Sequence, residues 1–334
     1  MKIGLIGTGR IGKLHAELLT YHIPEVEIKT AADLYINEAK DWAKQLNISN
    51  LTSDYTEILN DAEIEAVLIC SSTDTHAQLI IEAAKAGKHI FCEKPIDFDV
   101  EKIKQALKVV KEAGVKLQVG FNRRFDHNHK KIRQLVESGK VGAVQIVKIT
   151  SRDPAPPPIE YLKNSGGIFL DMTIHDFDMA RYLSMSEVVE VFAQGAVLID
   201  PAIGQIGDID TAIITLKFEN GALGVIDNSR QAVYGYDQRV EVFGSKGNAK
   251  VENDVPSSAK LSTSEGVISE KPLYFFLERY KMSFIEELKG FVDAIVEDKE
   301  PLVTGNDGLQ PVLVGMAALK SLKEKRIVRI EEVN

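Results

Sequence analysis

Cysteine is scarce in this chain of 334 residues, which contains only Cys70 and Cys92. Each cysteine ends a short apolar run, at 67–69 and at 89–91, so both are expected in buried strands. This usage excludes a disulfide-stapled scaffold and a thiolate-rich zinc framework. We therefore expect the protein to work in a reducing cytoplasm.

Long hydrophobic runs and excess positive charge are also lacking. No apolar stretch approaches the roughly 20 residues that cross a bilayer, so no membrane partner is expected. Residues 1–6 lead straight into a glycine motif, without the apolar core and cleavage site of a signal peptide. The 40 Lys and Arg face 49 Asp and Glu, a net charge of −9. That balance argues against a nucleic-acid partner and favours a small uncharged ligand.

The length and the composition are those of an ordinary folded protein. Hydrophobic residues make up 44% and charged residues 27%, which excludes a disordered or fibrous chain. At about 150 residues per domain, the length predicts two domains. We place the boundary so that residues 1–121 form a Rossmann domain and residues 122–334 form a domain for substrate binding and oligomerisation.

The first 120 residues alternate short apolar runs with longer amphipathic segments. This rhythm predicts a parallel, doubly wound α/β sheet. Gly114 ends the last of these helices in the usual way. The expected strands cover 3–6, 26–32, 66–70, 89–92 and 116–119, and the expected helices cover 11–20, 36–46, 75–86 and 101–113.

The rhythm changes after residue 140 to long stretches of alternating hydrophobicity. We expect strands at 144–151, 188–198, 211–218, 222–228 and 238–243, followed by two helices near 279–297 and 308–324. This pattern predicts an α+β domain built on a large, mostly antiparallel open sheet. Such a sheet commonly leaves one face uncovered, which is a natural surface for homo-oligomerisation.

A glycine motif, Gly7-Thr8-Gly9-Arg10-Ile11-Gly12, follows the first expected strand and opens a helix. In that context it predicts dinucleotide binding, because the glycines allow a tight turn and close approach of the backbone to a pyrophosphate. We expect all of Gly7, Gly9, Arg10, Ile11 and Gly12 to contact the cofactor. The alternative is an ordinary strand-to-helix turn.

Asp33 ends the second expected strand, 21 residues after Gly12. A carboxylate there accepts hydrogen bonds from both adenosine ribose hydroxyls and repels a 2′-phosphate. Leu34 and Tyr35 follow, with no adjacent Arg to bind such a phosphate, so NAD is favoured over NADP. The alternative is that Asp33 is only a turn residue.

Small hydroxyl residues follow the strand that ends at Cys70 and run into the next helix. They fit beside a flat cofactor, and we assign Ser71, Thr73 and His76 to cofactor binding. For His76, a packing or capping role is an equal alternative.

Two further segments carry candidate catalytic groups. Glu93-Lys94-Pro95 directly follows a strand, at the carboxyl edge where open α/β sheets place their ligands. Asp171 and His175 are four residues apart and share a face if their segment is helical. A solvated Lys94 and a purely structural Asp–His pair are the alternatives. We expect no metal, since no further ligands of suitable spacing accompany the pair.

Together, the glycine motif, Glu93-Lys94-Pro95 and the Asp171–His175 pair closely resemble the glucose-fructose oxidoreductase, inositol dehydrogenase and rhizopine catabolism (Gfo/Idh/MocA) family. The resemblance extends over essentially the whole chain. It implies that Lys94 and His175 contact the reacting carbinol, that Asp171 is a further substrate ligand, and that Glu93 and Lys94 also contact the cofactor.

The resemblance narrows to the inositol-oxidising members through the segments 120–126, 151–158, 171–182 and 227–237. It implies a set of polyol contacts at Asn122, Arg123, Asp153, Thr173 and Tyr234. For the charged members of this set and for Asn122, surface salt bridging is the alternative.

These expectations combine into one reaction, the NAD-dependent oxidation of a ring hydroxyl of myo-inositol to 2-keto-myo-inositol. His175 is expected to accept the hydroxyl proton, Lys94 to stabilise the alkoxide, and Asp171 to orient them. Two rivals stay open: a dehydrogenase of another cyclitol or sugar, and a catalytically silent NAD-binding sensor. The resemblance also implies a homotetramer.

Overall fold

The computed structural model describes all residues from 1 to 334, which divide into two compact units. The first unit comprises Met1–Asn122 and Ser283–Gln310, and the second comprises Arg123–Met282 and Pro311–Asn334. The chain thus leaves the first unit close to the boundary placed from the sequence and returns to it for residues 283–310. No helix is long and apolar enough to span a membrane.

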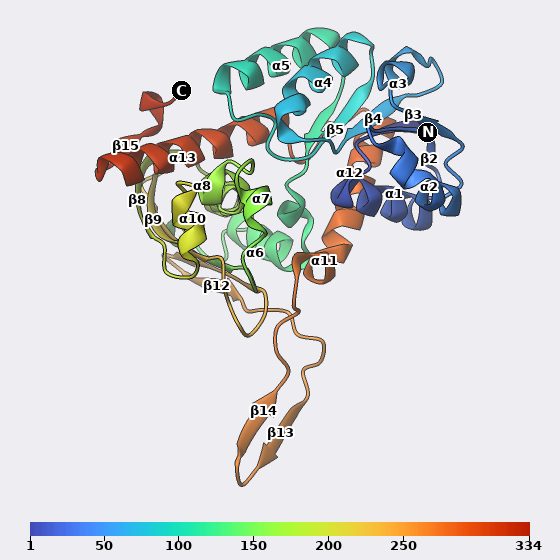
Figure 1. The fold of residues 1–334 in the computed structure, drawn as a ribbon. Helices are drawn as coiled ribbons and strands as arrows, with labels where there is room; N and C mark the ends of the chain where they lie inside the picture. The colour runs from blue at the N-terminus through green and yellow to red at the C-terminus, as the bar shows by residue number, and fades with distance from the viewer. The chain divides into compact units, whose positions relative to one another are not determined.

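The first unit contains a six-stranded parallel sheet in the order β3-β2-β1-β4-β5-β6 (Figure 1). The central strands are short and almost entirely buried, because helices flank a parallel sheet on both faces. The expected doubly wound fold is confirmed. The strands are β1 Lys2–Ile6, β2 Glu27–Ala32, β3 Asn50–Thr52, β4 Ala66–Ile69, β5 His89–Cys92 and β6 Leu117–Val119.

Helices make the crossovers of this sheet. They are α1 Arg10–His22, α2 Lys40–Gln45, α3 Thr56–Asn60, α4 Thr73–Lys85 and α5 Val100–Ala113, with α12 Lys281–Val296 supplied from later in the chain. The Asp99 side chain caps the start of α5, and Gly114, at φ 68°, ends it. The strand order reverses between β2-β1 and β4-β5-β6, so the carboxyl ends of β1 and β4 flank the topological switch point.

The second unit contains a seven-stranded sheet in the order β12-β11-β7-β10-β9-β8-β15. The β7–β10 pair is parallel and the other pairs are antiparallel, so the expected mostly antiparallel sheet is confirmed, with one parallel pair inside it. Its strands are β7 Val144–Arg152, β8 Val188–Ala196, β9 Thr211–Phe218, β10 Leu223–Ser229, β11 Asp237–Gly244, β12 Gly247–Val251 and β15 Val328–Arg329.

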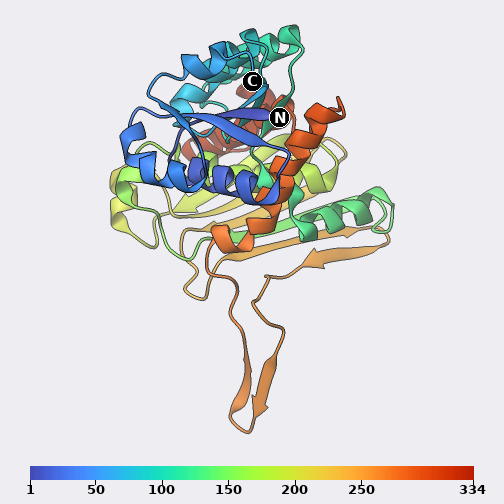
Figure 2. The same ribbon diagram turned by 90° about the vertical axis from the view of Figure 1, so that its right-hand side faces the viewer.

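Helices cover one face of this sheet (Figure 2). Apolar side chains of α6 His127–Glu137, α9 Ile174–Ser184 and the end of α13 Gly305–Glu324 join inward-facing strand residues in a single buried cluster. This cluster is the hydrophobic core of the second unit. The shorter helices of the unit are α7 Ile159–Leu162, α8 Gly167–Asp171, α10 Pro201–Gln205 and α11 Phe276–Arg279.

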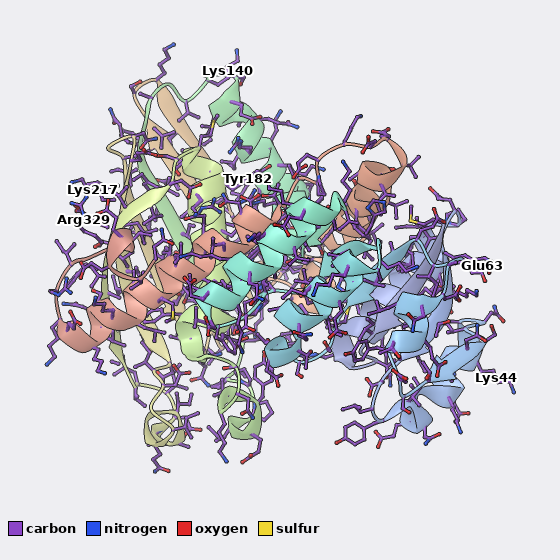
Figure 3. The ribbon with its side chains drawn as sticks, turned by 90° about the horizontal axis from the view of Figure 1, so that it is seen from above. Lys44, Glu63, Lys140, Tyr182, Lys217 and Arg329 are labelled. Atoms are coloured by element: carbon purple, nitrogen blue, oxygen red, sulfur yellow. The ribbon has the colours of Figure 1, made fainter.

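The opposite face of the sheet is uncovered. Phe243, Ile146 and Leu223 lie in adjacent register on β11, β7 and β10, and each is more than 40% exposed. Charged pairs continue this row at one end: Lys217 and Arg329, labelled at one edge of the unit in Figure 3, both pair with Glu190, at 3.6 and 3.7 Å. The open face therefore carries an apolar row on β11, β7 and β10 and charged residues on β9, β8 and β15.

A two-stranded hairpin, β13 Lys260–Thr263 and β14 Gly266–Ser269, extends away from the seven-stranded sheet (Figures 1 and 2). Every residue of its two strands is exposed. Leu261 and Ile268 face each other across it, 59% and 65% exposed. The sequence does not predict this hairpin, because its strands are four residues long and lack the apolar alternation of a half-buried strand.

Candidate active site

The turn after β1 is possible only with glycine. Gly7 has φ 99°, and a Cβ there would lie 2.6 Å from the backbone of Cys70 and Ser71. A Cβ on Gly12 would lie 2.0 Å from the carbonyl oxygen of Gly7. The motif thus brings helix α1 directly against the strand ends, as a dinucleotide-binding turn requires.

Gly9 leaves open space at the start of α1. No atom lies within 4 Å of an ideal Cβ at Gly9, and no side chain caps the first turn of the helix. The first amides of α1 and its positive dipole end are therefore available to an anion such as a pyrophosphate. Arg10 is exposed and Ile11 half-buried at this end, so these residues fit a dinucleotide.

Asp33 lies beside the glycine turn with its carboxylate fixed by two backbone amides. Oδ2 accepts from the N–H of Thr8 at 2.6 Å, and Oδ1 accepts from the N–H of Tyr35 at 2.8 Å. Partial burial alone would raise the pKa of Asp33, but these hydrogen bonds outweigh it and lower that pKa. An anionic Asp33 next to the turn favours ribose hydroxyls over a 2′-phosphate. Leu34 and Tyr35 beside it are exposed, 82% and 72%.

The hydroxyl residues after β4 form the entry to α4. Ser71 and Thr75 share a hydrogen bond of 2.7 Å, and Thr73 is half-buried in the first turn. His76 is 1% exposed, with Nδ1 2.8 Å from the carbonyl oxygen of Pro95 and Nε2 3.1 Å from that of Ser71. The His76 ring thus holds the Ser71 loop against the loop that carries Lys94.

Glu93 and Lys94 follow β5 at the carboxyl edge of the sheet. The Glu93 carboxylate lies 2.7 Å from Nε2 of the buried His15 and accepts from the Lys94 N–H at 3.3 Å. Its side chain passes over Gly120, where a Cβ would come within 3.1 Å. The Lys94–Pro95 peptide is cis, and the Lys94 side chain is half-buried. Glu93 therefore fixes the backbone that presents Lys94.

In the second unit, Asp171 ends α8 and His175 stands in the first turn of α9. The two short helices are joined through Met172 and Thr173, so the pair lies at a helical junction rather than in one continuous helix. The Asp171 carboxylate accepts from the Tyr161 hydroxyl at 2.8 Å and lies 3.5 Å from the guanidinium of Arg230. Both Asp171 and His175 are half-buried.

A buried polar network lies next to this junction. Arg123 contacts Asp176 at 2.6 Å, and the other Asp176 oxygen accepts from Asn228 at 2.8 Å. The Thr173 hydroxyl donates to the Asn228 side chain at 2.7 Å. Arg123 and Thr173 are thus members of one network, whereas Asn122 belongs to the first unit and donates to Ser283 at 3.4 Å.

Asp153 is partly buried in the second unit, whereas Tyr234 is exposed. Burial raises the pKa of Asp153 to about 7, against the opposing effect of Arg230 and with a further rise from Asp171. The Tyr234 hydroxyl donates to Asp237 at 2.5 Å and accepts from Arg152 at 3.3 Å. Burial, followed by the Asp237 contact, raises the pKa of Tyr234, so its hydroxyl stays protonated.

Three residues that contact candidate catalytic or polyol-binding groups could not be assigned roles from the sequence. Tyr161 and Arg230 both bind Asp171, and Asp176 neutralises Arg123. Arg230 and Asp176 lie inside the segments 227–237 and 171–182, which resemble the inositol-oxidising members of the family. That resemblance is the sequence signal that could have pointed to them. For Tyr161 the sequence offers no signal, because its partner is ten residues away and outside any helical spacing.

A parallel sheet with this glycine turn and an anionic Asp33 defines a protein with an NAD-binding Rossmann fold. Residues 1–121 match the oxidoreductase family with an NAD-binding Rossmann fold, and residues 129–250 match the GFO/IDH/MocA C-terminal domain. The chain belongs to the Gfo/Idh/MocA family. The recognition made from the sequence motifs is thereby confirmed.

Relatives match over the whole chain. The myo-inositol 2-dehydrogenase of Thermotoga maritima is 50% identical, over 100% of this chain and 99% of its own. A crystal structure of a probable dehydrogenase from Thermotoga maritima superposes with a TM-score of 0.97 at 50% identity, covering 100% of both chains. The scyllo-inositol dehydrogenase of Lactobacillus casei, solved with NAD(H) and scyllo-inositol, gives a TM-score of 0.92 at 32% identity, covering 99% of each chain.

The position of Asp33 generates a test of cofactor choice. Combining Asp33→Ser with Leu34→Arg removes the repulsive carboxylate and adds a phosphate partner, so the NAD to NADP ratio of kcat/KM should fall by about tenfold or more. Leu34→Arg alone is the matched control and should change the ratio less. Wild-type efficiency that is equal with both cofactors, or a ratio unmoved in the double variant, would reduce Asp33 to a turn residue.

The raised pKa of Asp153 generates a test of stability against pH. The folded state holds this proton more tightly than the unfolded chain, so its stabilising effect is full below pH 4 and disappears as the pH rises through 7. Asp153→Asn has no proton to lose at this position, so the variant does not lose stability in this way as the pH rises. The free energy of unfolding of the variant, relative to wild type, should therefore rise by about 4 kcal/mol between pH 4 and pH 8 in urea titrations. A difference that is constant across this range contradicts the assignment.

Proposed function

We propose that this protein is an NAD-dependent inositol 2-dehydrogenase, which oxidises a ring secondary hydroxyl of myo-inositol to 2-keto-myo-inositol. One observation carries the proposal. Lys94, Asp171 and His175 are all present in a chain that matches, over its full length, a relative named myo-inositol 2-dehydrogenase. A silent NAD-binding sensor would need the glycine turn and Asp33 but none of these three residues.

Each protein group has one task in the proposed reaction. Bound NAD accepts the carbon-bound hydrogen as hydride at nicotinamide C4. The imidazole of His175 takes the hydroxyl proton, as a neutral histidine is a suitable base near pH 7. The Lys94 ammonium stabilises the negative charge that develops on the carbinol oxygen. Asp171, held by Tyr161, orients the hydroxyl and the imidazole.

The polyol contacts are proposed at Asn122, Arg123, Asp153, Thr173 and Tyr234. Hydroxyl groups of a cyclitol need both donors and acceptors, and this set offers amide, guanidinium, carboxyl and hydroxyl groups. Arg123 and Thr173 already belong to the buried network around Asp176, which supports a fixed rather than adaptable geometry. Such a site favours one arrangement of hydroxyls.

The alternative is a dehydrogenase of another cyclitol or sugar, supported by the scyllo-inositol dehydrogenase among the relatives. A steady-state survey of myo-inositol, scyllo-inositol, other inositols and aldoses, each with NAD and NADP, distinguishes the two. A kcat/KM for myo-inositol at least tenfold above the rest supports the proposal. Preference for another polyol replaces the substrate but keeps the reaction class.

We further propose that the protein is cytoplasmic and assembles as a homotetramer through the open face of its second sheet. The location is supported by Cys70 and Cys92, which are buried free thiols. The assembly is supported by the apolar row of Phe243, Ile146 and Leu223, which a second copy would cover. Closed symmetry would bury this row on every subunit.

Substitution of Lys94 or His175 tests the proposed chemistry. Lys94→Ala and His175→Ala should each lower kcat on myo-inositol by on the order of 10² to 10⁴, because one loses the charge stabiliser and the other the base. NAD affinity and the thermal midpoint should stay close to wild type. Lys111→Ala and His22→Ala, which change exposed residues of the same types, are the controls. Near-wild-type turnover in a folded His175→Ala would remove His175 as the base.

Charges placed on the open face test the proposed assembly. Ile146→Asp combined with Leu223→Asp would bury two unpaired carboxylates in each interface, so the particle mass from light scattering at micromolar concentration should fall below that of a tetramer. Val296→Asp, at a 71% exposed valine of α12, is the control and should leave the mass unchanged. A monomeric wild type would contradict the proposal directly.

A further inference from the structure

Arg230 is a fully buried cation that no part of the proposed chemistry uses. It directly follows β10 and has no exposed surface. One guanidinium nitrogen lies 3.5 Å from Oδ2 of Asp171, and the other lies 3.6 Å from Oδ2 of Asp208. A single guanidinium therefore bridges two carboxylates that are 37 residues apart in the chain.

The second carboxylate belongs to the support of helix α8. Oδ1 of Asp208 accepts the N–H of Ile168 at 3.0 Å, in the first turn of α8. Gly167 adopts φ 76°, and a Cβ there would meet Asp208 Oδ1 at 2.9 Å. Asp208 is thus packed against the start of the same short helix that ends at Asp171. Arg230 connects the two ends of α8.

The backbone around Arg230 is anchored independently. Its N–H donates to the carbonyl oxygen of Asp210 at 2.8 Å. The Asp210 carboxylate in turn accepts the amides of Leu198, Ile199 and Asp200, at 2.8 to 3.2 Å. The guanidinium is therefore presented from a fixed point of the sheet rather than from a loose loop.

Arg230 is a poor source of stability. Its Nε and Nη2 are buried without a hydrogen-bond acceptor, although Nη2 lies at ion-pair distance from Asp208. Desolvating a cation on these terms costs as much as or more than its ion pairs return, so a hydrophobic residue would serve the fold as well. What Arg230 provides, and a hydrophobic residue would not, is a positive charge next to Asp171.

We propose that Arg230 is a positioning residue for the dehydrogenase reaction, holding the Asp171 carboxylate in place by bridging it to Asp208. This inference rests on the proposed role of Asp171. Each Asp171 oxygen then has its own partner: the Tyr161 hydroxyl at Oδ1, 2.8 Å away, and Arg230 at Oδ2. The Asp171 carboxylate is thereby fixed in orientation.

The charged surroundings determine what loss of Arg230 does. Tyr161 faces Asp171 from α7, Arg230 from the end of β10, and Asp153 from the segment after β7, while His175 follows one turn later on α9. Arg230 is the cation paired with Asp171 in this set, and Asp153 and Asp208 are further acids. Removal of the guanidinium therefore leaves acids close together without this cation and raises the pKa of Asp153, which Arg230 lowers in the wild type.

Arg230→Met tests the proposal. It should lower kcat on myo-inositol by about 10- to 100-fold, the effect of a misplaced catalytic group, while NAD affinity stays unchanged. The acidic limb of the kcat profile should move to higher pH. Arg230→Lys should return the acidic limb of the kcat profile toward its wild-type pH, because the positive charge is restored. It should restore only part of the kcat value, because an ammonium cannot bridge two carboxylates as the planar guanidinium does.

Asp208→Asn is the matched partner variant, since an Asn oxygen still accepts from Ile168 while the ion pair with Arg230 is lost. It should lower kcat severalfold without moving the acidic limb upward. Arg326→Met, which removes an exposed arginine paired with Glu324 and Glu332, is the control and should match wild type. If Arg230→Met does not fold, Arg230→Lys and Asp208→Asn still decide the question.

Two results would overturn the proposal: a folded Arg230→Met with wild-type kcat and pH profile, or one whose kcat falls together with its thermal midpoint while the acidic limb stays in place. A readout without turnover separates this from the proposed function. The ¹³C carboxyl signal of Asp153, assigned by its loss in Asp153→Asn, should titrate at higher pH in Arg230→Met than in wild type, because Arg230 lowers the pKa of Asp153. An enzyme inactive on every polyol refutes the proposed function, and this titration still tests Arg230.

Discussion

Burial of charge on helix α9 is the constraint on which the second unit depends. Asp176 and Asp178 lie on this helix with 0% and 1% exposure, so each must be neutralised within the protein. Consecutive residues of one segment do this, as Arg123 pairs with Asp176 and Arg124 with Asp178, both at 2.6 Å. Loss of one partner from such a pair typically lowers the free energy of unfolding by about 3–5 kcal/mol. Helix α9 can therefore pack against the sheet in only one position. His175, in the first turn of α9, takes its position from those pairs.

The two units fix their candidate catalytic groups by different means. In the first, backbone geometry dominates: glycines bring chain segments into contact, and Glu93 holds the peptide that carries Lys94. The buried Glu287 of α12 lies close enough to Glu93 to interact, and burial followed by that interaction holds the pKa of Glu287 well above its usual range. In the second unit, side-chain networks dominate. A glycine pattern is visible in a sequence, whereas a network is not.

That difference explains what could be predicted. Five of the six strands and the longer crossover helices of the first unit follow from local periodicity, and Gly7, Gly9, Gly12 and Asp33 follow from spacing. Pairing across the chain does not: the parallel β7–β10 register, the Tyr161 contact and the Arg230 bridge join segments 10 to 77 residues apart. Short elements such as β3 and α3 bury too few residues to leave a periodic signal. The region expected as one helix at 36–46 is a 3₁₀ turn, Ile36–Ala39, followed by α2.

The β13–β14 hairpin pairs only with itself and contributes no residue to the buried core of the second unit. A lone two-stranded ribbon is stabilised only slightly by its own few hydrogen bonds, and the seven-stranded sheet does not depend on it for its stability. Changes of length are therefore inexpensive here: a descendant of this chain could lengthen, shorten or delete the ribbon while the core and the Asp171 junction stay as they are. Natural variation should accumulate in this segment first, and a protease should cut the folded chain at its tip.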